Sequence, residues 1–309
     1  KGGQWVLRHG PLARRSLPPL TTPRWTALVQ GVDLHHEGVH ALMQQFRFVP
    51  EARLDDLMIS YATDGGGVGP HFDSYDVFLL QAHGQRRWRI GRQKDKTLRS
   101  GLPLKILAAF EPEEGHVLEP GDMLYLPPGW AHDGIAVGEC MTYSIGFRSP
   151  NGAQLAHEVL QRIAEGAADE EGAIYRDAQQ PAVAGPGAIP AELQDFARQA
   201  VQRALAQPQA LECALGEALT EPKPNVWFEP AEAGGMLECL TLDRRTRMMY
   251  DDKHVFINGE SYRASGRDAT LMRRLADERR LEPRDLVRAS DEALELLSAW
   301  CEAGWAHAR

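Results

Sequence analysis

Apolar and polar residues alternate in short runs between residues 57 and 148, and glycine or proline separates the runs. A period of two places successive side chains on opposite faces of a strand, so each run predicts a β-strand with one buried face. Many short strands with Gly/Pro turns and almost no helix predict a closed or sandwiched antiparallel barrel. The predicted strands are Leu57–Tyr61, Asp76–Gln81, Arg86–Ile90, His116–Leu118, Asp122–Leu126 and Met141–Phe147, with a turn at His83-Gly84 between the second and the third.

A helical period replaces this alternation after Pro150. Apolar residues spaced for one helix face predict helices over 153–164 and 191–206, separated by a linker rich in Pro, Gly, Ala and Gln. Asn258-Gly259 within an alternating run indicates a two-residue β-hairpin, which helices would follow to make a winged-helix-like α+β domain. The predicted units are a barrel domain over 1–150, a helical region over 151–210 and a winged-helix-like domain over 211–309, whose last two helices are expected at 268–279 and 291–303.

Composition and charge narrow the class of protein. The chain has 309 residues, of which 43% are hydrophobic and 25% charged, as in an ordinary globular protein with room for two domains. A net charge of −9 argues against binding nucleic acid mainly through phosphate neutralisation, so we expect docking or dimerisation and no direct nucleic-acid contact. Four cysteines without C-x-x-C spacing predict a cytoplasmic protein, and no apolar run approaches the ~18 residues of a membrane span.

Two halves of a metal-binding motif lie within the predicted barrel. Gly65–Asp73, with His71-x-Asp73 at its end, fits the first half of a cupin metal motif, and Gly121–His132 fits the second. Two histidines and one carboxylate are the ligand set of non-haem iron(II) oxygenases. Four-ligand cupins carry a glutamate four or five positions after the first pair, where this chain has apolar residues. Roughly three octahedral positions would therefore stay open for a bidentate co-substrate and dioxygen. Satisfied core histidines beside turns are the alternative, which matching spacing in both halves disfavours.

An arginine on an apolar strand face predicts a buried anion. Strand alternation places Arg86 on the face of Trp88, and burying an unpaired charge is costly. A forked guanidinium suits a carboxylate such as the distal one of 2-oxoglutarate. The alternative is a surface-facing arginine triplet with Trp88 outside. Thr142 and Ser144 share the small polar face of the last predicted strand, and one of their hydroxyls would hydrogen-bond the same carboxylate.

These residues resemble the bacterial JmjC-type ribosomal oxygenases, which hydroxylate arginine in a large-subunit ribosomal protein. The resemblance rests on Gly65–Gly91, Leu124–Gly134 and Tyr143–Asn151, and it extends more loosely over nearly the whole chain. It implies a mainly β double-stranded β-helix core of the cupin or jelly-roll JmjC type, an α-helical region that forms a homodimer, and a C-terminal winged helix. It also implies that iron(II) binds to His71, Asp73 and His132, that Arg86 binds 2-oxoglutarate, and that dioxygen is used to hydroxylate C3 of the arginine.

Two features depart from the family's pattern. Family members often carry a serine two or three residues before the glycine run that helps hold the co-substrate, whereas this chain has Ala62-Thr63-Asp64 there. Either Thr63 substitutes for the serine or the contact is lost. Asp64 is a candidate partner for a substrate guanidinium at the pocket rim, or an ordinary loop aspartate. Family members also begin with an extra segment, and this chain starts at Lys1 rather than Met, so we expect that natural N-terminal sequence is missing.

The metal motif does not decide the target, because the triad only generates the oxidant. The same chemistry on histidine, or demethylation, is the first alternative. A non-catalytic cupin sensor whose winged helix binds DNA is the second, and the acidic charge balance disfavours it.

Overall fold

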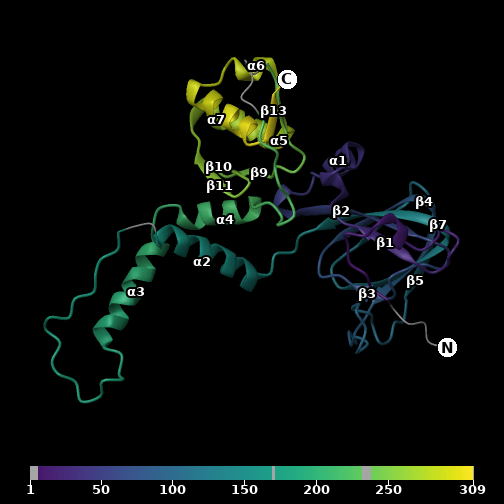
Figure 1. Cartoon of the computed structure of the whole chain (residues 1–309), viewed down its shortest axis with the longest axis horizontal. Helices are drawn as coiled ribbons and strands as arrows, with labels where there is room; N and C mark the ends of the chain where they lie inside the picture. The colour runs from purple at the N-terminus through teal and green to yellow at the C-terminus, as the bar shows by residue number, and fades with distance from the viewer. Residues whose placement is uncertain (1–5, 169–170, 232–237, 309) are drawn as a thin grey trace. The chain divides into compact units, whose positions relative to one another are not determined.

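The computed structural model describes residues 6–168, 171–231 and 238–308, and the chain divides into two compact units, Lys1–Ser149 and Pro150–Arg309. The N-terminal unit is built mainly from antiparallel strands, and the C-terminal unit holds most of the α-helices (Figure 1). Among the described residues, no helix is both long enough and apolar enough to span a lipid bilayer.

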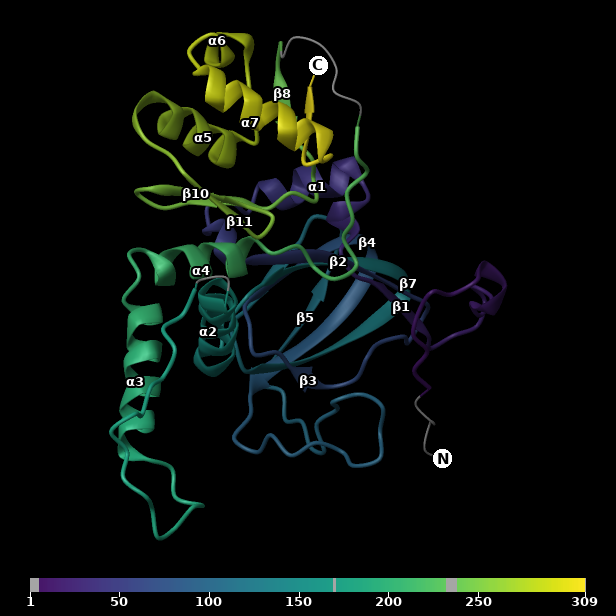
Figure 2. The same cartoon turned by 60° about the vertical axis from the view of Figure 1, so that its left-hand side comes forward.

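Two long, bent strands form the centre of the N-terminal unit. β4 (Val77–Arg92) and β7 (Trp130–Phe147) pair antiparallel along their length, and Figure 2 shows their curvature. Shorter strands pair with parts of both of them and complete a seven-stranded sheet. This arrangement is that of the double-stranded β-helix that the family resemblance implied. The other elements of the unit are β1 (Thr26–Val29), β2 (Leu54–Ala62), β3 (His71–Phe72), β5 (Glu114–Leu118), β6 (Met123–Leu126), α1 (Glu37–Gln44) and short 3-10 helices at Arg14–Ser16, Val32–Leu34 and Glu51–Arg53.

The neighbours of the two long strands explain where the site forms. β2 pairs with the second half of β7, and β3 pairs with the start of β7. β6 and β5 pair with successive parts of β4. The outer face of this sheet packs against α1 through Val39 and Met43, which contact Leu57 and Ile145. The inner face is therefore left to line the barrel.

The predicted turn at His83-Gly84 is wrong, because β4 runs through these residues as one strand with a β-bulge. The register against β7 shifts between Gln81 and His83 and again between His83 and Gln85. Gly84 has a φ of 60°, and a Cβ there would lie 2.0 Å from the carbonyl oxygen of Glu139. Only glycine fits such a position without strain. A bulge that adds one residue reverses which alternate side chains point inward.

The bulge places Arg86 inside the barrel, as the alternation with Trp88 predicted. Gln81 fastens the bulge from within, because its Nε2 donates to the carbonyl oxygens of His83 (2.8 Å) and Gly84 (3.1 Å). Its Oε1 accepts a hydrogen bond of 2.8 Å from the Thr142 hydroxyl. The buried positions of β4 are Val77, Leu79 and Gln81 before the bulge and Arg86, Trp88 and Ile90 after it.

The C-terminal unit combines three helices with a winged-helix fold. Both predicted helices of the helical region are confirmed, as α2 (Gly152–Ala168) and α3 (Ala191–Leu205). The Asn258-Gly259 hairpin is also confirmed, with positive φ at both residues. The other elements are α4 (Ala210–Thr220), β8 (Leu240–Leu242), β9 (Met248–Tyr250), β10 (His254–Ile257), β11 (Glu260–Arg263), α5 (Gly266–Glu278), β12 (Arg280–Leu281), α6 (Pro283–Leu286), α7 (Asp291–Glu302) and β13 (Ala306–Ala308).

Helix α4 was not predicted. Its Gly216 allows close approach to the hairpin, since a Cβ there would lie 2.3 Å from the Phe256 ring. A helix whose position depends on such a contact shows little amphipathic period of its own, because its fit is decided by tertiary packing. The core of the unit lies between β10, α5 and α7, where Ile257, Leu275 and Leu297 are fully buried.

Candidate metal centre and co-substrate site

His71, Asp73 and His132 lie together at one end of the barrel. His71 on β3 pairs directly with His132 on β7, and Asp73 is the first residue after β3. One ligand atom from each of the three side chains lies within 4.8 Å of the others. His132 Nε2 is 3.6 Å from an Asp73 carboxylate oxygen. Side chains 59 positions apart in the chain thus converge, with the spacing that a shared metal ion requires.

Backbone contacts orient both imidazole rings. His71 Nδ1 lies 2.8 Å from the carbonyl oxygen of Gly69, and His132 Nδ1 lies 3.1 Å from that of Trp130. A ring whose Nδ1–H donates to a carbonyl keeps Nε2 unprotonated and free to bind a metal. Burial, followed by the neighbouring His71, lowers the pKa of His132 to about 4. His132 is therefore neutral at pH 7, the state in which it can act as a ligand.

The turn before His132 also fixes Asp73. The backbone N–H of Gly129 donates to the Asp73 carbonyl oxygen at 2.7 Å, and Gly129 has a φ of 80°. Burial and the adjacent Asp73 carboxylate raise the pKa of Tyr75. The position where four-ligand cupins carry glutamate is occupied by Val77 in the core. Two imidazole nitrogens and one carboxylate, with no fourth ligand among the residues that the structure describes, fit an open iron(II) site.

Arg86 is buried and has no carboxylate partner among the described residues. Only 4% of it is exposed, its Nη2 donates to Cys140 Sγ at 3.4 Å, and its guanidinium lies 5.7 Å from the centre of the Trp88 ring. Its Nε is buried without any hydrogen-bond acceptor. Such an unsatisfied cation is costly to bury. These observations fit a site for an anionic group, and a dicarboxylate such as 2-oxoglutarate would supply one.

The two predicted hydroxyls differ in what they contact. Thr142 is buried and donates to Gln81, so its hydrogen bond contributes to fastening the bulge. Ser144 is 9% exposed and lies opposite Leu79 of β4. Cys140, which was not predicted as a site residue, lies on β7 and its sulfur accepts a hydrogen bond from Arg86. The same alternation that paired Thr142 with Ser144 also puts Cys140 on this face, so that signal was present in the sequence.

The Ala62-Thr63-Asp64 segment makes contacts with its own neighbourhood. The Thr63 hydroxyl accepts a hydrogen bond of 3.3 Å from the backbone N–H of Trp25, the residue before β1. An Asp64 carboxylate oxygen accepts one of 2.8 Å from the backbone N–H of Gly138. Asp64 is exposed, and this contact supports its interpretation as a loop aspartate. Ala62 is fully buried and lies directly opposite Cys140.

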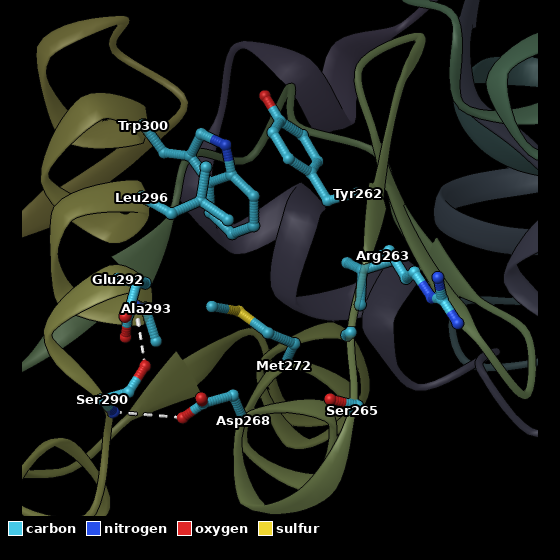
Figure 3. A pocket seen from close by; sticks show the side chains of 12 residues that line it. Tyr262, Arg263, Ser265, Asp268, Met272, Ser290, Glu292, Ala293, Leu296 and Trp300 are labelled. Atoms are coloured by element: carbon cyan, nitrogen blue, oxygen red, sulfur yellow. Dashed lines mark hydrogen bonds between the residues drawn. The ribbon is translucent and has the colours of Figure 1, made fainter.

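A pocket of about 270 Å³ lies in the C-terminal unit between α5, β11 and α7 (Figure 3). Trp300, Leu296 and Met272 form its apolar part. Two of its polar side chains serve the start of α7: Ser290 Oγ accepts from the N–H of Ala293, and Asp268 accepts from the N–H of Ser290. These contacts are those of a helix N-cap, so they assign the pocket no ligand.

Two family models match successive parts of the chain. A JmjC domain model matches residues 41–155, which include the metal-site residues, and a ROXA-like winged-helix model matches residues 202–307. The fold and the site thus define a JmjC-type cupin domain that is followed by a winged helix. The predicted fold class is confirmed.

Relatives narrow the class to one family. The chain is 38% identical over 237 residues to the ribosomal protein uL16 3-hydroxylase of Escherichia coli (strain K12), a match over 74% of this chain and 61% of that protein. The crystal structure of Escherichia coli ribosomal oxygenase YcfD matches 100% of this chain and 84% of its own, with 32% identity and a TM-score of 0.79. YcfD in complex with cobalt and 2-oxoglutarate matches 99% of this chain and 84% of its own, with 31% identity and a TM-score of 0.79. The chain belongs to the JmjC ribosomal oxygenase family.

Proposed function

We propose that this protein is an iron(II)- and 2-oxoglutarate-dependent oxygenase that hydroxylates C3 of an arginine in a large-subunit ribosomal protein. The observation that carries the proposal is a three-ligand cluster in the same barrel as a buried arginine, Arg86, for which the described part of the chain offers no carboxylate partner. The substrate class rests on the E. coli relative named as a ribosomal protein uL16 3-hydroxylase. The chain's match spans 61% of that relative's length.

The proposed roles follow from the geometry. His71, Asp73 and His132 would bind iron(II), which supplies the redox chemistry for activating dioxygen with 2-oxoglutarate. The neutral His132 and the carbonyl-oriented His71 hold Nε2 ready, so little reorganisation is needed for binding. Arg86 would bind the distal carboxylate of 2-oxoglutarate through its fork of N–H donors. The complex of YcfD with cobalt and 2-oxoglutarate supports the metal and the co-substrate.

Homodimerisation is part of the proposal, and helix α3 carries its support. Leu193, Val201 and Leu205 lie on one stripe of α3 and are 37%, 60% and 47% exposed. An exposed apolar stripe on an amphipathic helix is typical of a helix–helix interface. Light scattering measures the mass in solution, and a monomeric mass would contradict the dimer. We further propose a cytoplasmic location, where the ribosomal protein would be met, and no direct contact with nucleic acid, as the acidic charge balance favours.

The variant Asp73→Ala tests the metal assignment. Losing one of three ligands should abolish iron(II) binding and reduce succinate formation from 2-oxoglutarate by at least about 100-fold, as for groups that act together in catalysis. Metal content and succinate are measured on the same samples. Asp252→Ala, the same change at an exposed aspartate of the C-terminal unit, is the matched control. Unchanged turnover in Asp73→Ala would contradict the iron assignment.

A further inference from the structure

Among the residues that the structure describes, Arg86 makes a single polar contact, and this contact fixes its orientation. Its Nη2 donates to Cys140 Sγ at 3.4 Å, while its Nε has no acceptor. The remaining constraint is the Trp88 ring, 5.7 Å from the guanidinium. The Trp88 ring limits how far the guanidinium can tilt, but it allows the guanidinium to rotate within its own plane. The hydrogen bond to the sulfur therefore determines which N–H groups face away from the barrel wall.

Small residues surround this contact. Cys140 is fully buried and forms a cluster with Ala62 and Ala136. Ala62 of β2 lies directly opposite Cys140 of β7. Ala136 of β7 lies directly opposite Arg86 of β4. Neither alanine carries a hydrogen-bonding side chain, and the Thr63 hydroxyl is bonded to Trp25. In this part of the described chain, the Cys140 sulfur is therefore the acceptor available to the guanidinium.

We propose that Cys140 is a positioning residue that orients Arg86 for the distal carboxylate of the co-substrate. The sulfur accepts one Nη2–H and leaves Nε–H and the remaining Nη–H groups to form the fork that a carboxylate accepts. This role rests on the proposed function, because it requires a dicarboxylate co-substrate at Arg86. The thiol takes no part in the chemistry and touches neither metal nor reacting atoms.

Equilibrium binding of 2-oxoglutarate tests this role. Wild type and variants are titrated with 2-oxoglutarate by calorimetry, with manganese(II) in place of iron(II) so that no turnover occurs. Cys140→Ala removes the acceptor and should raise Kd about fivefold, the size expected for one modest hydrogen bond. Cys140→Ser keeps an acceptor and should stay within about twofold of wild type. Cys140→Val keeps the volume without an acceptor and should behave as Cys140→Ala does, should the alanine variant fold poorly.

A rescue variant separates orientation from packing. A serine at position 62 would place a hydroxyl directly across from position 140, so Ala62→Ser combined with Cys140→Ala should recover most of the lost affinity. Under turnover, KM for 2-oxoglutarate should rise in Cys140→Ala while kcat at saturating co-substrate stays within about twofold. Cys213→Ala, the same change at a half-buried cysteine of the C-terminal unit, is the matched control and should alter neither value.

The possible results separate the positioning role of Cys140 from the proposed oxygenase function. Wild-type Kd in both Cys140→Ala and Cys140→Val, or a fall in kcat with KM unchanged, would overturn the role of Cys140 and leave the oxygenase assignment intact. Failure of the wild-type protein to bind 2-oxoglutarate, or equal binding by Arg86→Ala, would overturn the proposed function and with it this role.

Discussion

Arg86 is a buried guanidinium without a carboxylate partner among the described residues. Burying such a group lowers the stability of the fold, so we infer that it binds an anion. Strand alternation alone placed it on the inner face with Trp88. The role of its neighbour Cys140 could not be predicted from a motif, because a single cysteine in a strand forms none. Its partner Arg86 is 54 positions away in the chain. Single inward positions can thus be predicted from a strand pattern, whereas contacts between strands require the register.

The substitution Arg86→Met should increase stability and remove function together. An apolar side chain of similar length relieves the burial of an unpaired charge, so the free energy of unfolding should rise by about 1 kcal/mol without co-substrate. Binding of 2-oxoglutarate should weaken by at least about tenfold, since a charge-assisted hydrogen-bonded pair is lost. Denaturant titration and calorimetry measure the two effects. Lower stability together with unchanged affinity would contradict the assignment of Arg86 to an anion.

The β-bulge in β4 is the element on which the co-substrate site depends. Sequence signals at His83-Gly84 indicated a break, and they predicted a turn because Gly in a strand is compatible with either outcome. The pairing of β4 with β7 on both sides decides for a bulge. The inward-facing Gln81 of β4 then stabilises the bulge through hydrogen bonds to the carbonyl oxygens of His83 and Gly84. No local sequence pattern predicts these hydrogen bonds, because they depend on the register shift.

Replacing Gln81 by leucine should loosen the bulge. The change leaves the carbonyl oxygens of His83 and Gly84 without their buried donor and the Thr142 hydroxyl without its acceptor, so the free energy of unfolding should fall by about 2–4 kcal/mol. Amide hydrogen exchange over residues 81–87 should accelerate more than in the rest of β4. Gln85→Leu on the same strand is the control, because Gln85 hydrogen-bonds Glu119 at the surface. Equal exchange in the two variants would contradict the role of Gln81.

The folds of both units of the molecule could be predicted from the sequence, but the side-chain contacts of the C-terminal unit could not. Motif residues and strand alternation defined the barrel unit, and the hairpin at Asn258-Gly259 identified the winged helix. The ion-pair network of the C-terminal unit was not predicted. Asp243, whose side chain is 5% exposed, binds the Arg245 guanidinium at 2.7 Å and lies 2.9 Å from His307 Nε2 on β13. It therefore ties the end of β8 to the last strand of the chain.

Acid should weaken this tie between Asp243 and its two partners. Burial acts to raise the pKa of Asp243, but hydrogen bonds from Arg245 and His307 outweigh it and hold that pKa well below its usual range. A carboxyl with a lowered folded-state pKa stabilises the fold above its unfolded value of about 3.9, and this contribution is lost as the pH falls below it. Amide exchange at residues 240–247, corrected for intrinsic rate, should therefore accelerate between about pH 4 and pH 2. Asp243→Asn should exchange faster already at pH 7, and a variant as protected as wild type would contradict the network.

The position of the added oxygen on the substrate tests the proposed arginine hydroxylation most directly. Ribosomal proteins incubated with this protein, iron(II) and 2-oxoglutarate are digested and analysed by tandem mass spectrometry, with the Asp73→Ala variant alongside. We expect a gain of one oxygen atom on an arginine of a large-subunit protein, absent with Asp73→Ala. A gain on histidine, loss of a methyl group, or no modification with active wild-type protein would contradict it.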